Sequence, residues 1–219
     1  MFDIDLNTYE LVDLSVTTQA GQAGDRPFLV ERGLLADGAY KFNIQTHSHV
    51  GTHVEFPAHF YGDHKRGVAN YPVDDFMGRA ILCRVTQAGL DPFISAAFLE
   101  HEIGEIIQPR DIVIFRNDGT RYDGSNIDAI PYFTAEAARW LRDKRVKLIV
   151  LDTIRMGRDI PEGREFHDIL MADGAEIPFV EIVENLDALK KRVFYVMCPP
   201  YKVQGLDSSF CRLVAIQEK

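Results

Sequence analysis

Apolar and polar residues alternate along this chain with two different periods, and together they predict a fold rich in strands. Several short runs are dominated by β-branched and other apolar residues, which is typical of buried or half-buried strands. These runs cover residues 9–16, 40–50, 79–85, 111–115, 146–151, 193–197 and 212–217. The run at 146–151 has the length and β-branched content of a strand buried on both faces.

Helical periodicity is clearest in residues 134–144, where Thr134 is a suitable N-cap ahead of an apolar side. Shorter helices are predicted over 92–101, 166–172 and 182–189, and residues 17–26 are predicted to form a loop. Strands outnumber helices, and the two are mixed along the chain. The pattern therefore predicts a β-rich α/β fold in a single domain over residues 1–219.

Length and composition narrow the class of protein. A chain of 219 residues that is 46% hydrophobic can bury one sizeable core. It carries 24 basic and 33 acidic residues, a formal net charge of -9, which argues against a nucleic-acid partner. We see no secretory signal and no apolar run long enough for a membrane span, and three cysteines without a CxxC pair suit a reducing compartment. A cytoplasmic protein without a membrane partner is expected.

Four of the seven histidines lie within residues 47–59, and a carboxylate lies among them. His49, His53 and Glu55 have the same parity, so an extended segment presents them on one face. Gly51 permits a sharp turn, and Pro57 prevents a long helix, so His59 can fold back toward the others. Imidazole and carboxylate groups at this density predict a metal site.

A single histidine is more often a surface or hydrogen-bonded residue than a metal ligand. His47 fits the spacing less well than His49, while His64 and His101 have the polar neighbours of solvated loops. Further ligands from distant parts of the chain are expected, and His167 is the remaining distant histidine. The carboxylates near it in the sequence are Asp168, Asp173, Glu176, Glu181 and Glu184, and composition does not choose among them.

The segment 49–60, HVGTHVEFPAHF, resembles the H-x-G-T-H-x-D-x-P-x-H-F signature of the cyclase-like metal-dependent hydrolases. Bacterial kynurenine formamidases and isatin hydrolases belong to that family. Residues 12–15 (VDLS), 134–152, 184–186 (ENL) and 205–215 are similar to other family elements. The resemblance implies a swivelling β/β/α fold, a small-molecule substrate and a homo-oligomer, either a dimer or a tetramer.

The same resemblance implies roles for individual residues. The implied metal ligands are His49, His53, Glu55, His59, His167 and Glu184, with His59 and His167 also placed as acid–base groups. The implied cofactor is Zn²⁺ or Mn²⁺, as one ion or two. Glu55 stands where the family has Asp, which changes how a carboxylate bridges two ions, and Glu181 competes with Glu184 for its role.

The predicted activity is hydrolysis of an amide, lactam or lactone, with an aryl formamide such as N-formylkynurenine as the most familiar family substrate. A bound metal would lower the pKa of a coordinated water toward neutrality and polarise the carbonyl. Two alternatives stay open. A cupin, either a metal oxygenase or a sugar-binding barrel, is suggested by His47, His49, Glu55 and Gly62. A catalytically inactive scaffold of the same fold is suggested by Glu55.

Overall fold

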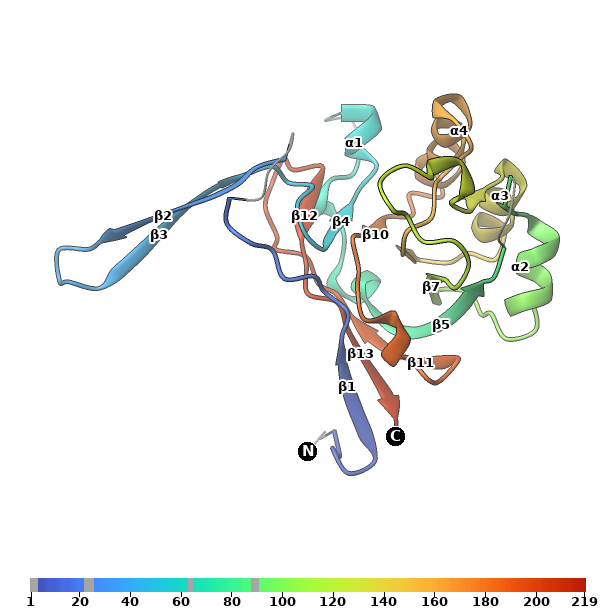
Figure 1. The fold of residues 1–219 in the computed structure, drawn as a ribbon, viewed down its shortest axis with the longest axis horizontal. Coiled ribbons are helices and arrows are strands. Elements are labelled where there is room, and N and C mark those ends of the chain that lie inside the picture. The colour runs from blue at the N-terminus through green and yellow to red at the C-terminus, as the bar shows by residue number, and fades with distance from the viewer. Residues whose placement is uncertain (1–3, 22–25, 63–64, 88–90) are drawn as a thin grey trace.

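One large mixed sheet organises the protein, and its centre is parallel (Figure 1). The computed structural model describes residues 4–21, 26–62, 65–87 and 91–219. The strands of the sheet are β1 (Tyr9–Asp13), β4 (His53–Glu55), β5 (Met77–Val85), β7 (Ile112–Asn117), β9 (Leu148–Leu151), β10 (Phe179–Glu181), β11 (Val193–Met197), β12 (Ser208–Phe210) and β13 (Val214–Glu218). Within the described residues their order is β1-β13-β11-β5-β7-β9-β10-β4-β12. The four strands β5, β7, β9 and β10 run parallel, and the flanking pairs are antiparallel.

The helices are α1 (Ala58–Tyr61), α2 (Ala96–Ile103), α3 (Ala135–Asp143) and α4 (Ile160–Met171). Short 3-10 turns occupy Val68–Asn70, Val73–Phe76, Ile127–Ala129 and Leu186–Ala188. The Thr134 side chain caps α3 by accepting the N–H of Ala137, as predicted. α4 begins six residues before its predicted start, because Asp159 caps it and a proline occupies its first turn. The predicted β-rich α/β class is confirmed. That residues 1–219 form a single domain stays a prediction.

The helix predicted over 182–189 is wrong, apart from the turn at Leu186–Ala188. Ile182 and Asn185 have positive φ values of 58° and 61°, which no right-handed helix permits. Val183 instead bridges Ser15, and the N–H of Glu184 donates to the carbonyl of Leu14 at 3.0 Å. Pairing with the N-terminal segment therefore overrides the local helical pattern.

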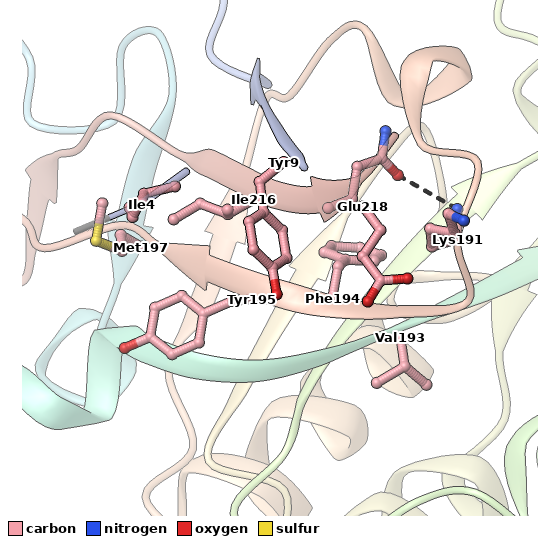
Figure 2. Close-up of a pocket in the computed structure, with 10 residues that line it drawn as sticks. Ile4, Tyr9, Lys191, Val193, Phe194, Tyr195, Met197, Ile216 and Glu218 are labelled. Atoms are coloured by element: carbon pink, nitrogen blue, oxygen red, sulfur yellow. Dashed lines mark hydrogen bonds between the residues drawn. The ribbon is translucent and has the colours of Figure 1, made fainter. Parts of the chain in front are cut away.

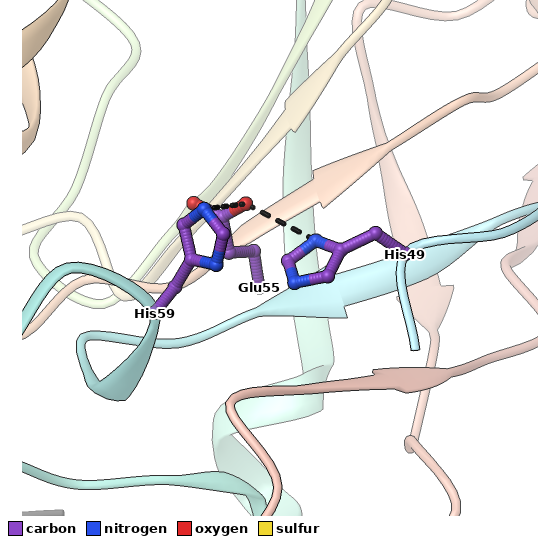
Figure 3. Close-up of side chains that lie close together, drawn as sticks. All are labelled: His49, Glu55 and His59. Atoms are coloured by element: carbon purple, nitrogen blue, oxygen red, sulfur yellow. Dashed lines mark ion pairs between the residues drawn. The ribbon is translucent and has the colours of Figure 1, made fainter. Parts of the chain in front are cut away.

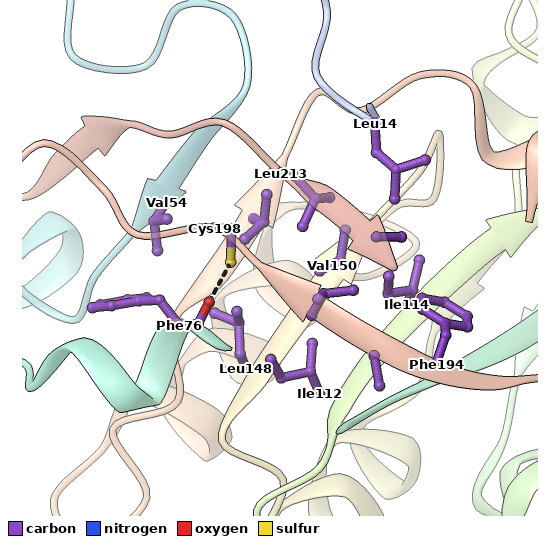
Figure 4. Close-up of a cluster of buried hydrophobic side chains, with 14 of the residues drawn as sticks. Leu14, Val54, Phe76, Ile112, Ile114, Leu148, Val150, Phe194, Cys198 and Leu213 are labelled. Atoms are coloured by element: carbon purple, nitrogen blue, oxygen red, sulfur yellow. Dashed lines mark hydrogen bonds between the residues drawn. The ribbon is translucent and has the colours of Figure 1, made fainter. Parts of the chain in front are cut away.

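Two hydrophobic clusters cover the opposite faces of the sheet, because neighbouring strand residues point to opposite sides. Even-numbered residues of the central strands, such as Ile114 and Val150, pack in one cluster with Val54 (Figure 4). Odd-numbered residues, such as Phe115 and Ile149, pack in the other cluster with α2, α3 and α4. On β4, the same alternation directs His53 and Glu55 away from Val54, toward the helix-covered face.

A hairpin of β2 (Phe28–Leu34) and β3 (Tyr40–Thr46) projects from the body as a separate two-stranded sheet (Figure 1). The remaining strands, β6 (Phe93–Ile94) and β8 (Tyr132–Phe133), form a two-residue parallel pair. The strand predicted over 40–50 ends at Thr46, and the strand β2 was not predicted. Across the described segments, no helix is long and apolar enough to cross a membrane.

Candidate metal centre

A tight turn at Gly51 brings His49 beside the strand that carries His53 and Glu55. Gly51 has a φ of +63°, and a Cβ at this position would lie 2.2 Å from Oγ1 of Thr18. Only glycine therefore suits both the backbone and the space here. The predicted turn at Gly51 is confirmed, but the segment 49–55 is not extended throughout, so His49 reaches the site through the turn.

His49, Glu55 and His59 form one group that can hold a metal ion. The rings of His49 and His59 approach the Glu55 carboxylate from two sides (Figure 3). Nδ1 of His49 lies 3.4 Å from Oε2 of Glu55, and Nε2 of His59 lies 3.8 Å from the same oxygen. His49 and Glu55 are buried, whereas the His59 side chain is 36% exposed. The group therefore consists of two buried side chains and one histidine ring that faces solvent.

Asp207 fixes the orientation of both rings of this group. Its Oδ2 lies 3.1 Å from Nε2 of His49 and 2.9 Å from Nδ1 of His59. A carboxylate accepts hydrogen bonds, so each ring donates to Asp207, and its other nitrogen, which carries a lone pair when the ring is neutral, faces Glu55. A carboxylate that accepts a hydrogen bond from a metal-binding histidine sets the tautomer of that ring. Asp207 lies within the segment 205–215 that resembles a family element, but nothing in the sequence indicated its place in the site.

His53 and Glu181 form a second group with Glu55. The pairing of β4 with β10 sets His53 directly opposite Glu181, and Nε2 of His53 lies 3.5 Å from Oε2 of Glu181. Nδ1 of His53 lies 2.8 Å from the carbonyl oxygen of Gly51, which requires a proton on Nδ1. When the ring is neutral, Nε2 therefore presents its lone pair to the two carboxylates.

His167, which lies on α4, is oriented in the same way as His53. Its Nδ1 lies 2.6 Å from the carbonyl oxygen of Gly163, one helical turn earlier, so Nδ1 is the protonated nitrogen. Its Nε2 lies 3.5 Å from Oε1 of Glu55. When the ring is neutral, a nitrogen lone pair and a carboxylate oxygen face each other, an arrangement that a cation or a proton between them stabilises.

Two buried polar atoms test whether a metal ion fits here. Nε2 of His53 and Oε1 of Glu55 have no hydrogen-bond partner among the described residues. An unpaired buried polar atom is unfavourable by about 1–3 kcal/mol, so a site with two such atoms is suited to an added ligand. Imidazole nitrogens and carboxylate oxygens at the ends of these side chains are donors that Zn²⁺ and Mn²⁺ accept. The residues present therefore fit a divalent ion.

The charges of the site favour the ionised carboxylates. Burial opposes ionisation of Glu55, but the hydrogen bonds that His167 and His49 donate to it when their rings are protonated outweigh burial and lower its pKa to about 2. Burial also opposes ionisation of Asp207, and the hydrogen bonds from His59 and His49 lower its pKa to about 2. For His49, burial favours the neutral ring, yet its hydrogen bonds to Glu55 and Asp207 raise its pKa. The site thus presents negative charge to a cation.

The structure separates the predicted site residues into two sets. It brings together His49, His53, Glu55, His59 and His167, with Glu181 in place of Glu184. Glu184 is exposed and lies outside both candidate metal groups. His47 is exposed beside the site, with its ring centroid 5.4 Å from that of His49. His64 lies outside the described residues.

Residues 12–158 match the protein family described as "Putative cyclase". The chain belongs to the cyclase family. The resemblance drawn from the sequence is therefore confirmed, and the parallel centre of the sheet excludes a cupin, whose jelly roll is antiparallel.

Several solved structures of other proteins share this fold. Isatin hydrolase A from Ralstonia solanacearum has 22% identity and a TM-score of 0.70, with 95% of this chain and 92% of that chain covered. An isatin hydrolase bound to the product analogue thioisatinate has 16% identity and a TM-score of 0.76, with 97% and 94% covered. A potential metal-dependent hydrolase with cyclase activity has 20% identity and a TM-score of 0.71, with 96% and 99% covered. A search of the curated proteins finds none that matches.

Proposed function

We propose that this protein is a metal-dependent hydrolase that opens an amide, lactam or lactone bond of a small molecule. The observation that carries the proposal is the pair of unpartnered buried atoms, Nε2 of His53 and Oε1 of Glu55. Both atoms belong to a site whose other rings are already oriented by Asp207 and by backbone carbonyls. The names of the structural relatives, which include isatin hydrolases, agree with this chemistry.

Glu55 lies between the two groups of donors, so the site has room for one ion beside His49 and His59 and one beside His53 and Glu181. A bound divalent ion supplies an activated water and a Lewis acid for the substrate carbonyl. The mixed nitrogen and oxygen donors suit Zn²⁺ or Mn²⁺. We propose His49, His53, Glu55, His59, Glu181 and His167 as the donors, with Glu181 replacing the predicted Glu184.

Among the histidines, His59 is the best placed to carry protons. Its side chain is 36% exposed and 2.9 Å from Asp207, so it has a path to solvent and a carboxylate to stabilise its charged form. The His167 side chain is only 9% exposed, and its Nδ1 is committed to the carbonyl of Gly163. We therefore assign proton delivery to the leaving group to His59, in a site where its Nε2 is not bound to the metal, and metal binding to His167.

A hollow of about 360 Å³ adjoins the site and is proposed to receive the substrate. Glu181 lines it together with apolar residues, among them Ile130, Leu151 and Ile154. Its size and lining suit a compact apolar molecule with a few polar atoms, such as an aryl lactam or an aryl formamide. A larger hollow of about 790 Å³ lies over β11 and β13 and includes none of the site histidines, so we do not assign the substrate to it.

The test measures metal content and hydrolysis together. Wild-type protein is loaded with Zn²⁺ or Mn²⁺ and offered a panel of aryl lactams, cyclic imides, aryl formamides and lactones, with chelated protein and His53→Ala as controls. We expect one or two equivalents of metal per chain and hydrolysis of at least one substrate class, both lost in His53→Ala.

The possible outcomes distinguish an active metal-dependent hydrolase from an inactive scaffold of the same fold. A wild type that takes up neither metal would overturn the proposal. Metal uptake without hydrolysis of any substrate would instead favour an inactive scaffold of the same fold. The homo-oligomer, the single functional unit over residues 1–219 and the cytoplasmic location stay predictions.

A further inference from the structure

The antiparallel pairing of β10 with β4 ends at Glu181 and His53, and the next pair along this ladder would be Ile182 and Thr52. The backbone of Ile182 leaves the strand at this point, because its φ is +58°. The hydroxyl of Thr52 donates instead to the carbonyl oxygen of Ile182 at 2.6 Å. A side-chain hydrogen bond therefore continues the pairing where the ladder ends, directly beside two candidate metal donors.

Ile182 has a backbone conformation that its side chain disfavours. Positive φ values are uncommon for residues other than glycine, and they are true outliers for a β-branched residue. Residues of this kind persist only where the surrounding structure holds them, and they cluster at functional sites. The chain is held after Ile182 by the bridge between Val183 and Ser15, and at Ile182 itself by the hydrogen bond from Thr52.

The Thr52 side chain connects three segments of the chain. It is buried, and its hydroxyl oxygen accepts the N–H of Val16 at 2.9 Å while it donates to Ile182. The carbonyl oxygen of Thr52 accepts the N–H of Cys211 at 3.1 Å, which fixes the backbone from which the hydroxyl projects. Only a hydroxyl can accept and donate in this way at this size, so a methyl group in its place would leave both backbone groups without this partner.

Each residue of this contact adjoins a candidate metal donor in the sequence. Thr52 precedes His53, and Ile182 follows Glu181, whose Oε2 lies 3.5 Å from Nε2 of His53. The contact therefore limits how far these two donors can move relative to each other. Functional sites need their groups held within about 0.5 Å of the productive geometry, so a supporting hydrogen bond at this place affects metal binding.

The same contact reaches the hollow that is proposed to receive the substrate. Ile182 lines the hollow of about 360 Å³ together with Glu181. The hollow of about 790 Å³ over β11 and β13 is lined by other residues, among them Tyr9, Tyr195 and Ile216, and its described lining includes neither of these two (Figure 2). A change at Thr52 is therefore expected to act on the metal centre and the smaller hollow.

We propose that Thr52 is a positioning residue of the metal centre. Its hydroxyl holds Ile182 in the left-handed conformation, which ends β10 and directs the Glu181 carboxylate toward His53. The inference rests on the proposed metal-dependent function, because Thr52 acts through two of the proposed donors. It concerns the affinity and the geometry of metal binding rather than any one substrate.

The experiment compares two substitutions of Thr52 with a control elsewhere in the sheet. Thr52→Val replaces the hydroxyl by a methyl group at nearly constant size, and Thr52→Ser keeps the hydroxyl. Ser209→Ala is the control, because the buried Ser209 hydroxyl also donates to a carbonyl oxygen, that of Tyr201, at 2.6 Å. Ser209 pairs with Val54, which is not a metal donor. Competition with a chelator measures the affinity for Zn²⁺, and the visible spectrum of Co²⁺-loaded protein reports the coordination geometry.

We expect Thr52→Val to lower the affinity by about 10–100-fold, the range for groups that support metal-binding residues, and to change the Co²⁺ spectrum. Thr52→Ser should have the affinity and the spectrum of the wild type, because it retains both hydrogen bonds. Ser209→Ala should lower thermal stability and leave affinity and spectrum unchanged. A purely structural role of Thr52 would make Thr52→Val behave like Ser209→Ala.

Circular dichroism checks that each variant is folded. If Thr52→Val does not fold, Thr52→Ala, which removes the hydroxyl without adding a methyl group in its place, carries the same expectation. Wild-type affinity and spectrum in the folded Val or Ala variant would overturn the inference, and so would an equal loss in Thr52→Ser. Metal uptake by the wild type separates this failure from failure of the proposed function, since a wild type that binds no metal would overturn both.

Discussion

Nε2 of His53 lies 3.5 Å from Oε2 of Glu181, because the antiparallel pairing of β4 with β10 sets the two residues opposite each other. Glu184 lies only three residues further along the chain, but the backbone turns after β10 and leaves its side chain exposed outside both metal groups. The sequence favoured Glu184 by resemblance. The register of the sheet favours Glu181.

Glu181→Ala and Glu184→Ala are therefore a matched pair. Removing Glu181 takes a carboxylate from the group around His53, so we expect metal affinity to fall by at least tenfold, the range seen when supporting groups of a metal site are lost. Glu184→Ala should bind metal like the wild type. Isothermal titration with Zn²⁺ or Mn²⁺ measures both variants. Equal affinities in the two variants would contradict the assignment.

His53→Ala and His47→Ala distinguish a buried donor from its exposed neighbour. The Nε2 atom of His53 is buried and has no hydrogen-bond partner in the described structure, whereas His47 is exposed. We expect His53→Ala to lose at least one equivalent of metal and His47→Ala to retain the wild-type content. Elemental analysis after dialysis against excess metal provides the measurement. Metal loss in His47→Ala alone would reverse the assignment.

Asp207→Asn is expected to weaken metal binding by about 10–100-fold without unfolding the protein, as is typical of groups that orient metal-binding histidines. The substitution removes the negative charge that accepts hydrogen bonds from His49 and His59. Ser48→Ala is the matched control, because the Ser48 hydroxyl donates only to Oδ1 of Asp207, at 3.2 Å. A structural role alone would lower thermal stability but leave the ring tautomers, observed by nitrogen NMR, unchanged.

Acid should destabilise the metal-free protein through Glu55. Its pKa is about 2 in the folded protein, below the ordinary value of 4.5, so its contribution to stability is present above pH 4.5 and is lost as pH falls toward 2. A shift of this size corresponds to roughly 3 kcal/mol. Urea unfolding of chelated protein between pH 6 and pH 2 measures this loss, and Glu55→Gln should show a smaller loss. An identical pH dependence in the two proteins would refute the role of Glu55.

Local sequence determined the centre of the site. His49, His53, Glu55 and His59 lie within eleven residues, so a turn at Gly51 and the alternation of one short strand are enough to gather them. The cap at Thr134 and the apolar runs of the central strands were also readable from the sequence, because their periodicity reflects burial on the two faces of one sheet.

Tertiary structure decided the rest, because it depends on contacts between residues far apart in the chain. Asp207 meets His49 across 158 positions, and β12 is brought there only by its pairing with β4. The register between β10 and β4 sets Glu181, and not Glu184, opposite His53, and α4 carries His167 to Glu55. The β2–β3 hairpin shows the same limit, since the sequence predicts a strand at residues 40–50, while only the fold leaves its apolar residues Tyr40, Phe42 and Ile44 exposed. Periodicity specifies which face of an element is apolar, but only packing decides what covers that face.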